Sequence, residues 1–256
     1  MAALTGKTVI VTGASKGIGA CTARAMVAEG ATVIAHYGHD RAGAEAAIIG
    51  AAPGKAHLLQ ADFGVMSEVD TFWDAALQIT GNVDVLVNNA GIMRQTGGIA
   101  DPVDDWDKVW AEAMAINVYA PARLMRHAVR NWLAAGTGGC IIGMGSWVST
   151  RGSANPGAIA YAASKAAIAA ATKTVARAHA AQGILAYVIA PGVVRTRMSV
   201  ESAAQTGGEA AVTANLPMGE WVPPEEVADL AVYLAQGRAR HMTGGTIDIN
   251  GAAYIR

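Results

Sequence analysis

Residues 8–19 read Thr-Val-Ile-Val-Thr-Gly-Ala-Ser-Lys-Gly-Ile-Gly, and the fold class can be inferred from them. The first four residues form an apolar, β-branched run without polar alternation, which is typical of a strand buried on both faces of a parallel sheet. A segment of helix formers follows the glycines and ends at Gly30. Strand, glycine-rich turn and helix in this order form a phosphate cradle, because glycines let the backbone approach a pyrophosphate and the helix N-terminus offers free N–H groups. A tight turn without any ligand is the alternative.

Further apolar, β-branched segments recur along the chain and alternate with helical ones. The predicted strands after the first span residues 32–37, 57–62, 83–87, 139–144, 184–189 and 246–249. No internal repeat or low-complexity linker divides the chain. We therefore predict an α/β fold with one domain over residues 1–256, a Rossmann-type doubly wound parallel sheet flanked by helices on both faces.

Composition narrows the classes of protein to which the chain can belong. Hydrophobic residues make up 52% of the 256 residues and charged residues 15%, which favours a large core over disorder. The net charge of −1, without a basic stripe, argues against nucleic acid as a partner. No apolar run reaches the roughly 18 residues of a membrane span, and we expect no signal peptide, so a cytoplasmic protein is expected. Cys21 and Cys140 are expected to be buried, reduced thiols, and no metal site is expected.

The end of the second predicted strand bears on the choice between NAD and NADP. Residues 36–41 read His-Tyr-Gly-His-Asp-Arg, without the acidic residue that usually binds the ribose 2′-hydroxyl of NAD at the strand end. Asp40 comes later and is expected to cap a helix. Lys16 in the glycine loop and Arg41 after the strand are two cations that favour a 2′-phosphate, and hence NADP. Solvated surface charges are the alternative for both.

Small or polar residues follow the other predicted strands. Asp62 ends the third strand, Asn88–Gly91 follow the fourth, Ser146 follows the fifth, and Ala190–Thr196 follow the sixth. Because ligands bind outside the carboxyl ends of the strands in open α/β sheets, we expect these residues at one ligand-binding edge.

Tyr161 and Lys165 lie four residues apart in a run of good helix formers. Positions i and i+4 share one face of a helix, so the phenol and the ammonium can point into one cleft. A nearby cation favours the phenolate and lowers its pKa, and a shift of about 3 units takes about 4 kcal/mol. The same spacing also arises by chance on solvated helix faces, so the pair indicates a catalytic site only in combination with the other motifs of the chain.

Together these motifs resemble the short-chain dehydrogenase/reductase family, in its single-domain branch and in particular its 3-oxoacyl-carrier-protein reductase-like members. Thr12–Gly19 matches the family's Thr-Gly-x-x-x-Gly-x-Gly, and Asn88–Gly91 matches its Asn-Asn-Ala-Gly. Ser146 matches its catalytic serine, and Tyr161 with Lys165 matches its Tyr-x-x-x-Lys. The resemblance covers essentially the whole chain.

The resemblance implies an NAD(P)-dependent oxidoreductase that transfers a hydride between a nicotinamide cofactor and a carbonyl or secondary alcohol. Tyr161 would be the general acid or base, and Lys165 would lower its pKa and hold the nicotinamide ribose. Ser146 would bind the substrate oxygen, and Asn117 would anchor a water in a proton relay. The implied cofactor contacts are Gly13, Ser15, Lys16, Gly17, Ile18 and Gly19, then Tyr37, Arg41, Asp62, Phe63, Asn89, Ala90 and Gly91, and finally Tyr161, Lys165, Pro191, Gly192, Val194 and Thr196.

The sequence departs from the family pattern in one respect. The family's serine commonly stands about a dozen residues before the tyrosine, whereas Ser146 stands 15 before Tyr161 and Ser149 stands 12 before it. We prefer Ser146 because it directly follows a predicted strand, which fixes its direction.

Several readings of function and assembly stay open. A non-catalytic dinucleotide-binding regulatory protein is the main alternative, although such a protein would be expected to lose one of the three catalytic residues. A halohydrin lyase would replace Lys165 by arginine and the glycine loop by bulkier residues. Residues 197–221 are a candidate substrate lid, and 3-oxoacyl thioesters, small ketones, and sugars or cyclic alcohols all remain compatible substrates. The family resemblance implies a homotetramer or homodimer.

Overall fold

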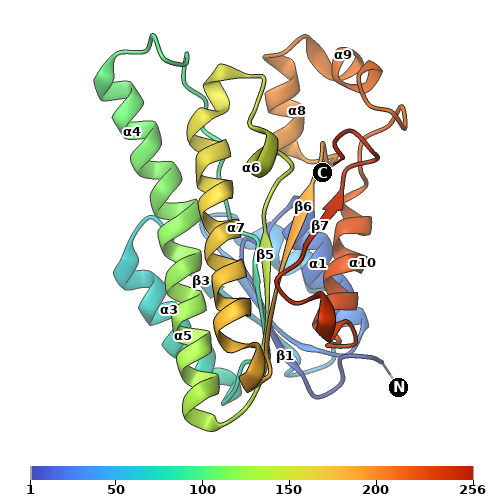
Figure 1. Ribbon diagram of the computed structural model, residues 1–256. Helices are drawn as coiled ribbons and strands as arrows, with labels where there is room; N and C mark the ends of the chain where they lie inside the picture. Colours follow the sequence, from blue (N-terminus) through green and yellow to red (C-terminus); the bar gives the residue numbers. More distant parts are fainter. Residues whose placement is uncertain (1, 256) are drawn as a thin grey trace.

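The computed structural model describes residues 2–255, whose strands form one parallel sheet in the order β3-β2-β1-β4-β5-β6-β7 (Figure 1). From β1 the chain builds outward to β3 and then returns to place β4 on the other side of β1. The loops after β1 and β4 therefore diverge, and a crevice opens between them at the carboxyl edge of the sheet. The strands are β1 Thr8–Val11, β2 Thr32–Tyr37, β3 Ala56–Gln60, β4 Val85–Asn88, β5 Gly139–Met144, β6 Ile184–Pro191 and β7 Thr246–Ile249.

Helices cover both faces of the sheet, which explains why its strands are apolar without alternation. Val9 and Val11 of β1 pack in the core layer that holds α1 (Gly17–Ala28), α2 (Arg41–Ala47) and α10 (Pro224–Ala235). Ile10 points the opposite way, as the two-residue period of a strand requires, into the layer beneath α3, α5 and α7. In Figure 1, α5 and α7 lie to the left of the sheet and α1 and α10 to its right. The second set of helices is α3 Met66–Thr80, α5 Ala120–Ala135 and α7 Ile159–His179.

The remaining helices lie above the carboxyl edge or join the larger elements. Helix α4 (Val103–Met114) continues into α5 through a π-helical segment at Ala115–Tyr119, and π segments often mark functional sites. The helices that follow strands β5 and β6 are α6 Val148–Arg151, α8 Arg197–Ala204 and α9 Gly208–Ala214, and 3₁₀ turns span Pro156–Ala158, Ala180–Gln182 and Arg240–Met242. No helix among residues 2–255 is both long and apolar enough to cross a membrane.

The predicted doubly wound parallel sheet is confirmed, with two local corrections. The third strand ends at Gln60 rather than at Asp62, because the Asp62 carboxylate accepts a hydrogen bond from Gly64 N–H at 2.8 Å and turns the chain. Cys21 is partly exposed rather than buried, and its thiol donates to Glu225 Oε1 at 3.3 Å. Asp40 caps α2 as predicted, accepting from Gly43 N–H at 2.9 Å.

Candidate active site

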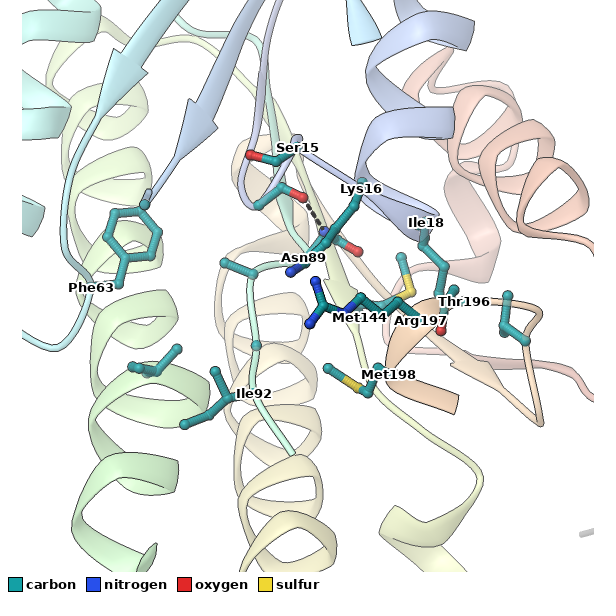
Figure 2. A pocket seen from close by; sticks show the side chains of 18 of the residues that line it. Ser15, Lys16, Ile18, Phe63, Asn89, Ile92, Met144, Thr196, Arg197 and Met198 are labelled. Carbon is teal, nitrogen blue, oxygen red and sulfur yellow. Dashed lines mark hydrogen bonds between the residues drawn. The ribbon is translucent and has the colours of Figure 1, made fainter. Parts of the chain in front are cut away.

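A cleft of about 450 Å³ lies at the carboxyl edge of the sheet, at the crevice between the loops after β1 and β4 (Figure 2). The loop after β1 and the start of α1 form one part of its wall, and the ends of β5 and α7 form another. The cleft therefore lies where the strand order reverses, which is where open α/β sheets bind their ligands.

The glycine loop has the geometry of a phosphate cradle. Gly13 adopts a left-handed φ of +66°, and a Cβ there would come within 2.9 Å of Ala90 Cα. A Cβ on Gly19 would overlap the carbonyl oxygen of Gly13, so the loop can only close on itself with glycine at both positions. Lys16 precedes α1 without a side-chain cap, which leaves the first amides of the helix uncapped at the cleft. Uncapped amides and the helix dipole fit a pyrophosphate.

Asn89 and Thr12 hold the loop after β1 against the loop after β4. The Thr12 hydroxyl accepts hydrogen bonds from the N–H groups of Asn89 and Ala90, both at 2.9 Å. The Asn89 amide donates to the carbonyl oxygens of Thr12 and Gly13, at 2.8 and 3.3 Å. In Figure 2 the Asn89 side chain lies between the two loops. Its two N–H donors are thus engaged in the framework of the cleft.

Ser146, Tyr161 and Lys165 meet at one end of the cleft. Ser146 lies two residues beyond the end of β5, while Tyr161 and Lys165 stand one turn apart on α7. The hydroxyl of Ser146 lies close enough to the phenol of Tyr161 to lower the pKa of that phenol. Lys165 Nζ lies 5.8 Å from the centroid of the Tyr161 ring and donates to the carbonyl oxygen of Met144 at 2.8 Å. The three predicted catalytic side chains are therefore gathered in one place.

Burial controls the protonation of this group. Burial raises the pKa of Tyr161, and the nearby hydroxyl of Ser146 only partly offsets that rise. Burial also lowers the pKa of Lys165 from 10.5 to about 8. The sequence predicted a lowered pKa for Tyr161, and the structure corrects this, because desolvation outweighs the favourable contacts of the phenolate.

Ser149, the alternative catalytic serine, is not among the residues that line the cleft. It stands on α6, and its hydroxyl donates to the backbone carbonyl of Ser146, which also accepts from the Ser149 N–H at 3.0 Å. Ser149 thus stabilises the turn that presents Ser146.

Asn117 lies behind the cleft, 1% exposed, in the π-helical segment. Its Oδ1 accepts from Ile92 N–H at 2.8 Å, and its Nδ2 donates to Ile92 O and to Ser164 Oγ, both at 2.9 Å. Ser164 in turn donates to the carbonyl oxygen of Tyr161 at 2.8 Å. The amide therefore clamps the loop after β4 to the tyrosine helix, and both its N–H donors are used by protein groups rather than left for the predicted water.

Most of the cofactor contacts predicted from the sequence line the cleft, with two exceptions. Tyr37 is buried in the fold, and Arg41 Nε lies 2.8 Å from Glu45 Oε1 on the exposed side of α2. The positions that do line the cleft are Gly13, Ser15, Lys16, Gly17, Ile18, Gly19, Asp62, Phe63, Asn89, Ala90, Gly91, Tyr161, Lys165, Pro191, Gly192, Val194 and Thr196.

The structure adds lining residues that sequence reasoning missed. His36 and His39 lie at the end of β2, and Met144 closes β5 beside Ser146. Arg94 reaches the cleft from the loop after β4, whereas Met198, which reaches it from α8, lies in the candidate lid that the sequence predicted. The one sequence signal for these residues was their position at or beyond the carboxyl end of a predicted strand. Of the candidate lid 197–221, only its first turn, Arg197–Ser199, lines the cleft.

Comparisons with known proteins agree with this geometry. Residues 13–252 match the family model described as Enoyl-(Acyl carrier protein) reductase. The chain is 37% identical to 3beta-hydroxysteroid dehydrogenase 1 of Eggerthella lenta, over 98% of this chain and 95% of that protein. It is 34% identical to a 3-oxoacyl-[acyl-carrier-protein] reductase of Synechocystis sp., over the full length of both. Among solved structures, a protein from Agrobacterium tumefaciens with bound NADP, provisionally assigned as a 2-deoxy-D-gluconate 3-dehydrogenase, gives a TM-score of 0.84 at 30% identity, covering 98% of this chain and 97% of that one.

Proposed function

The chain belongs to the short-chain dehydrogenase/reductase family and is an NAD(P)-dependent oxidoreductase acting on CH–OH groups, and we propose that Tyr161, Ser146 and Lys165 carry its reaction. The observation that supports these roles is the shape of one cleft. It holds a phosphate cradle at the glycine loop and a serine, tyrosine and lysine cluster at the end of β5. A cofactor laid across the switch point would reach from one to the other.

The proposed steps follow from the state of each side chain. The nicotinamide cofactor, when bound, supplies or accepts the hydride. Tyr161 keeps its proton at neutral pH because burial raises its pKa, so it can donate that proton to the oxygen of a carbonyl substrate. Ser146, which lines the cleft beside the phenol, is placed to bind the same oxygen and stabilise its developing charge. Lys165 supplies a positive charge beside the phenolate that remains.

NADP is the cofactor, and we assign recognition of its 2′-phosphate to Lys16. Lys16 lines the cleft, and no carboxylate stands at the end of β2, where NAD-binding relatives of this architecture place one. Asp40 also lines the cleft, but its carboxylate is engaged in capping α2. The NADP-bound relative supports the same choice. Arg41 is left out of this assignment because it pairs with Glu45.

Initial rates with NADPH and NADH, measured across ketones, cyclic and sugar alcohols, and 3-oxoacyl thioesters, test the proposal. We expect turnover with NADPH to exceed that with NADH. Tyr161→Phe should abolish turnover and leave NADP binding measurable, because the variant loses the proton donor while the other residues that line the cleft stay in place. Retained turnover in this variant would contradict the assignment of Tyr161 as the general acid. NADP binding without turnover on any substrate would favour the regulatory protein instead.

We also propose a single domain over residues 1–256, a lid at 197–221, a cytoplasmic location and a homotetramer. Both cysteines are free, which suits a reducing compartment. Exposed apolar side chains lie on two separate surfaces, with Tyr119 and Leu133 on the α4–α5 side and Tyr233 and Met242 near β7. Two such surfaces suit two different contacts between copies. Light scattering during size-exclusion chromatography would reveal the number of copies.

A further inference from the structure

His36 is an imidazole buried at the end of β2, with 3% of its surface exposed and both ring nitrogens hydrogen-bonded. Nδ1 lies 3.0 Å from Gly13 N, whose N–H can only donate, so Nδ1 must be the unprotonated acceptor. Nε2 lies 3.0 Å from the carbonyl oxygen of Ala61, which can only accept, so Nε2 carries the hydrogen. These two partners fix one neutral tautomer.

The packing around the ring enforces this neutral state. His36 stacks on Phe63 with ring centroids 3.8 Å apart and planes 6° apart, and it meets Phe72 edge-on at 5.1 Å. Burial lowers its pKa from 6.5 to about 4, opposed only by the carbonyl of Ala61. The charged side chains on the elements around it, which are Lys16 on the loop after β1, Asp40 after β2, Asp62 after β3 and Glu68 on α3, do not contribute to this shift.

The imidazole completes the support of the glycine loop. From the β4 side, Thr12 and Asn89 hold the loop, as described above. From the β2 side, His36 makes two contacts with the loop: its carbonyl oxygen accepts from Ala14 N–H at 2.8 Å, and its Nδ1 accepts from Gly13 N–H. The Ser15 hydroxyl adds a third contact on this side, donating to the carbonyl oxygen of Asp40 at 2.8 Å. Gly13 carries the left-handed backbone that turns the chain into the cradle. Without an acceptor at the Nδ1 position, this turn would keep a partly buried N–H with no partner.

We propose that His36 is a positioning residue, whose Nδ1 lone pair holds the Gly13 turn in the geometry that binds the cofactor. The proposal rests on the cofactor site of the proposed function. His36 contributes through Gly13 and the ring of Phe63 rather than through the reacting atoms, which lie at the other end of the cleft. Its loss should therefore weaken cofactor binding and leave the chemical step intact.

Three substitutions separate the acceptor from the bulk of the ring. Asn at position 36 places an acceptor oxygen near the Nδ1 position, although it is smaller than histidine. His36→Gln places its terminal amide near Nε2, so it keeps the donor to Ala61 and lacks the acceptor for Gly13. His36→Leu fills space and offers neither. If His36 only filled the core, the larger Gln and Leu should replace it better than Asn.

The experiment is a titration of each variant with NADP, followed by tryptophan fluorescence or calorimetry, together with KM for NADPH and kcat. We expect roughly tenfold weaker binding in His36→Leu and His36→Gln, and binding within about threefold of wild type in His36→Asn, because a buried N–H without an acceptor is costly. The kcat at saturating NADPH should stay within about twofold in every variant, since it reports the chemical step. His57→Asn on the neighbouring strand, where the ring contacts only Gly54 O at 3.2 Å and does not line the cleft, is the matched control.

The outcomes are distinguishable. If His36→Leu and His36→Gln bind NADP as tightly as the wild type does, the role of His36 is overturned and the proposed function is not. Better binding by Gln than by Asn also overturns it, and this comparison remains decisive where the Leu variant does not fold. Failure of the wild-type protein to bind NADP would overturn the proposed function and the role of His36 with it.

Discussion

Replacing Lys165 by methionine should stabilise the fold while removing activity. The ammonium is buried, with 6% of the residue exposed, and its one hydrogen-bond acceptor among residues 2–255 is the carbonyl oxygen of Met144. Methionine keeps an unbranched apolar stem of similar length and removes the charge. The variant therefore separates what the charge costs the fold from what it contributes to the reaction.

The size of the effect follows from the pKa. In the folded protein the pKa of Lys165 is about 8, against 10.5 for an unburied lysine. The unfolded chain thus binds this proton more tightly, and at pH 7 the charged lysine costs the fold about 3 kcal/mol. Methionine removes this cost but leaves the carbonyl of Met144 without its N–H donor, at about 1 kcal/mol. The net gain is about 2 kcal/mol, or a rise in Tm of about 4–8 °C for a domain of this size.

The pH dependence gives the sharper test. As pH rises from about 8 to 10.5, Lys165 loses its proton in the folded protein before it does so in the unfolded chain. The free energy of unfolding of the wild type should therefore increase over this pH range. Lys165→Met lacks this rise, so its advantage should shrink or reverse by pH 10. Urea unfolding of both proteins at pH 7 and pH 10, at one protein concentration and without cofactor, measures the difference. A variant that is less stable than wild type at pH 7, or a difference that does not change with pH, would refute the reasoning. Turnover should fall by about 100-fold or more in the same variant.

Three further predictions concern the cleft. Ser146→Ala should lower kcat by about 100-fold, because it loses a donor to the substrate oxygen, whereas Ser149→Ala should keep most of the activity. Steady-state rates of both variants at saturating NADPH check this, and a larger loss in Ser149→Ala would assign the catalytic role to Ser149. Lys16→Ala should raise KM for NADPH about tenfold and leave KM for NADH unchanged, while Arg41→Ala should change neither KM, since Arg41 pairs with Glu45. Equal effects of Lys16→Ala on the two KM values would contradict the 2′-phosphate assignment. The lowered pKa of His36 means that, as pH falls below 6.5, the unfolded chain binds a proton at this residue before the folded protein does, so the fold should lose up to about 3 kcal/mol of stability as pH falls through 4. In urea unfolding at pH 7 and pH 4.5, His36→Asn should lack this part of the loss. Equal losses of stability in the variant and the wild type would disprove the assignment.

The parts of the structure that the sequence predicted are those that depend on local pattern. The apolar runs at β1 and β2 predicted their strands because burial on both faces removes the polar alternation. The glycine spacing predicted the cradle because Gly13 and Gly19 stand where a Cβ would meet backbone atoms. Tyr161 and Lys165 were predictable for a similar reason, since helical spacing alone sets them on one face. In each case a short stretch of chain contains the whole physical cause.

The predictions that the structure changed depend on contacts between distant elements. Arg41 could be counted as a cation from the sequence, but its partner one helical turn away, Glu45, directs it along α2 rather than toward the cleft. The raised pKa of Tyr161 comes from burial that no helical spacing reveals. His36 shows the point most fully, because its role needs Gly13, 23 residues earlier, and Ala61, 25 residues later, to meet the same ring. In the sequence the missing acid at the end of β2 indicated only that NADP is favoured over NAD. In the fold the same position holds a neutral acceptor that supports the loop on which that cofactor is proposed to rest.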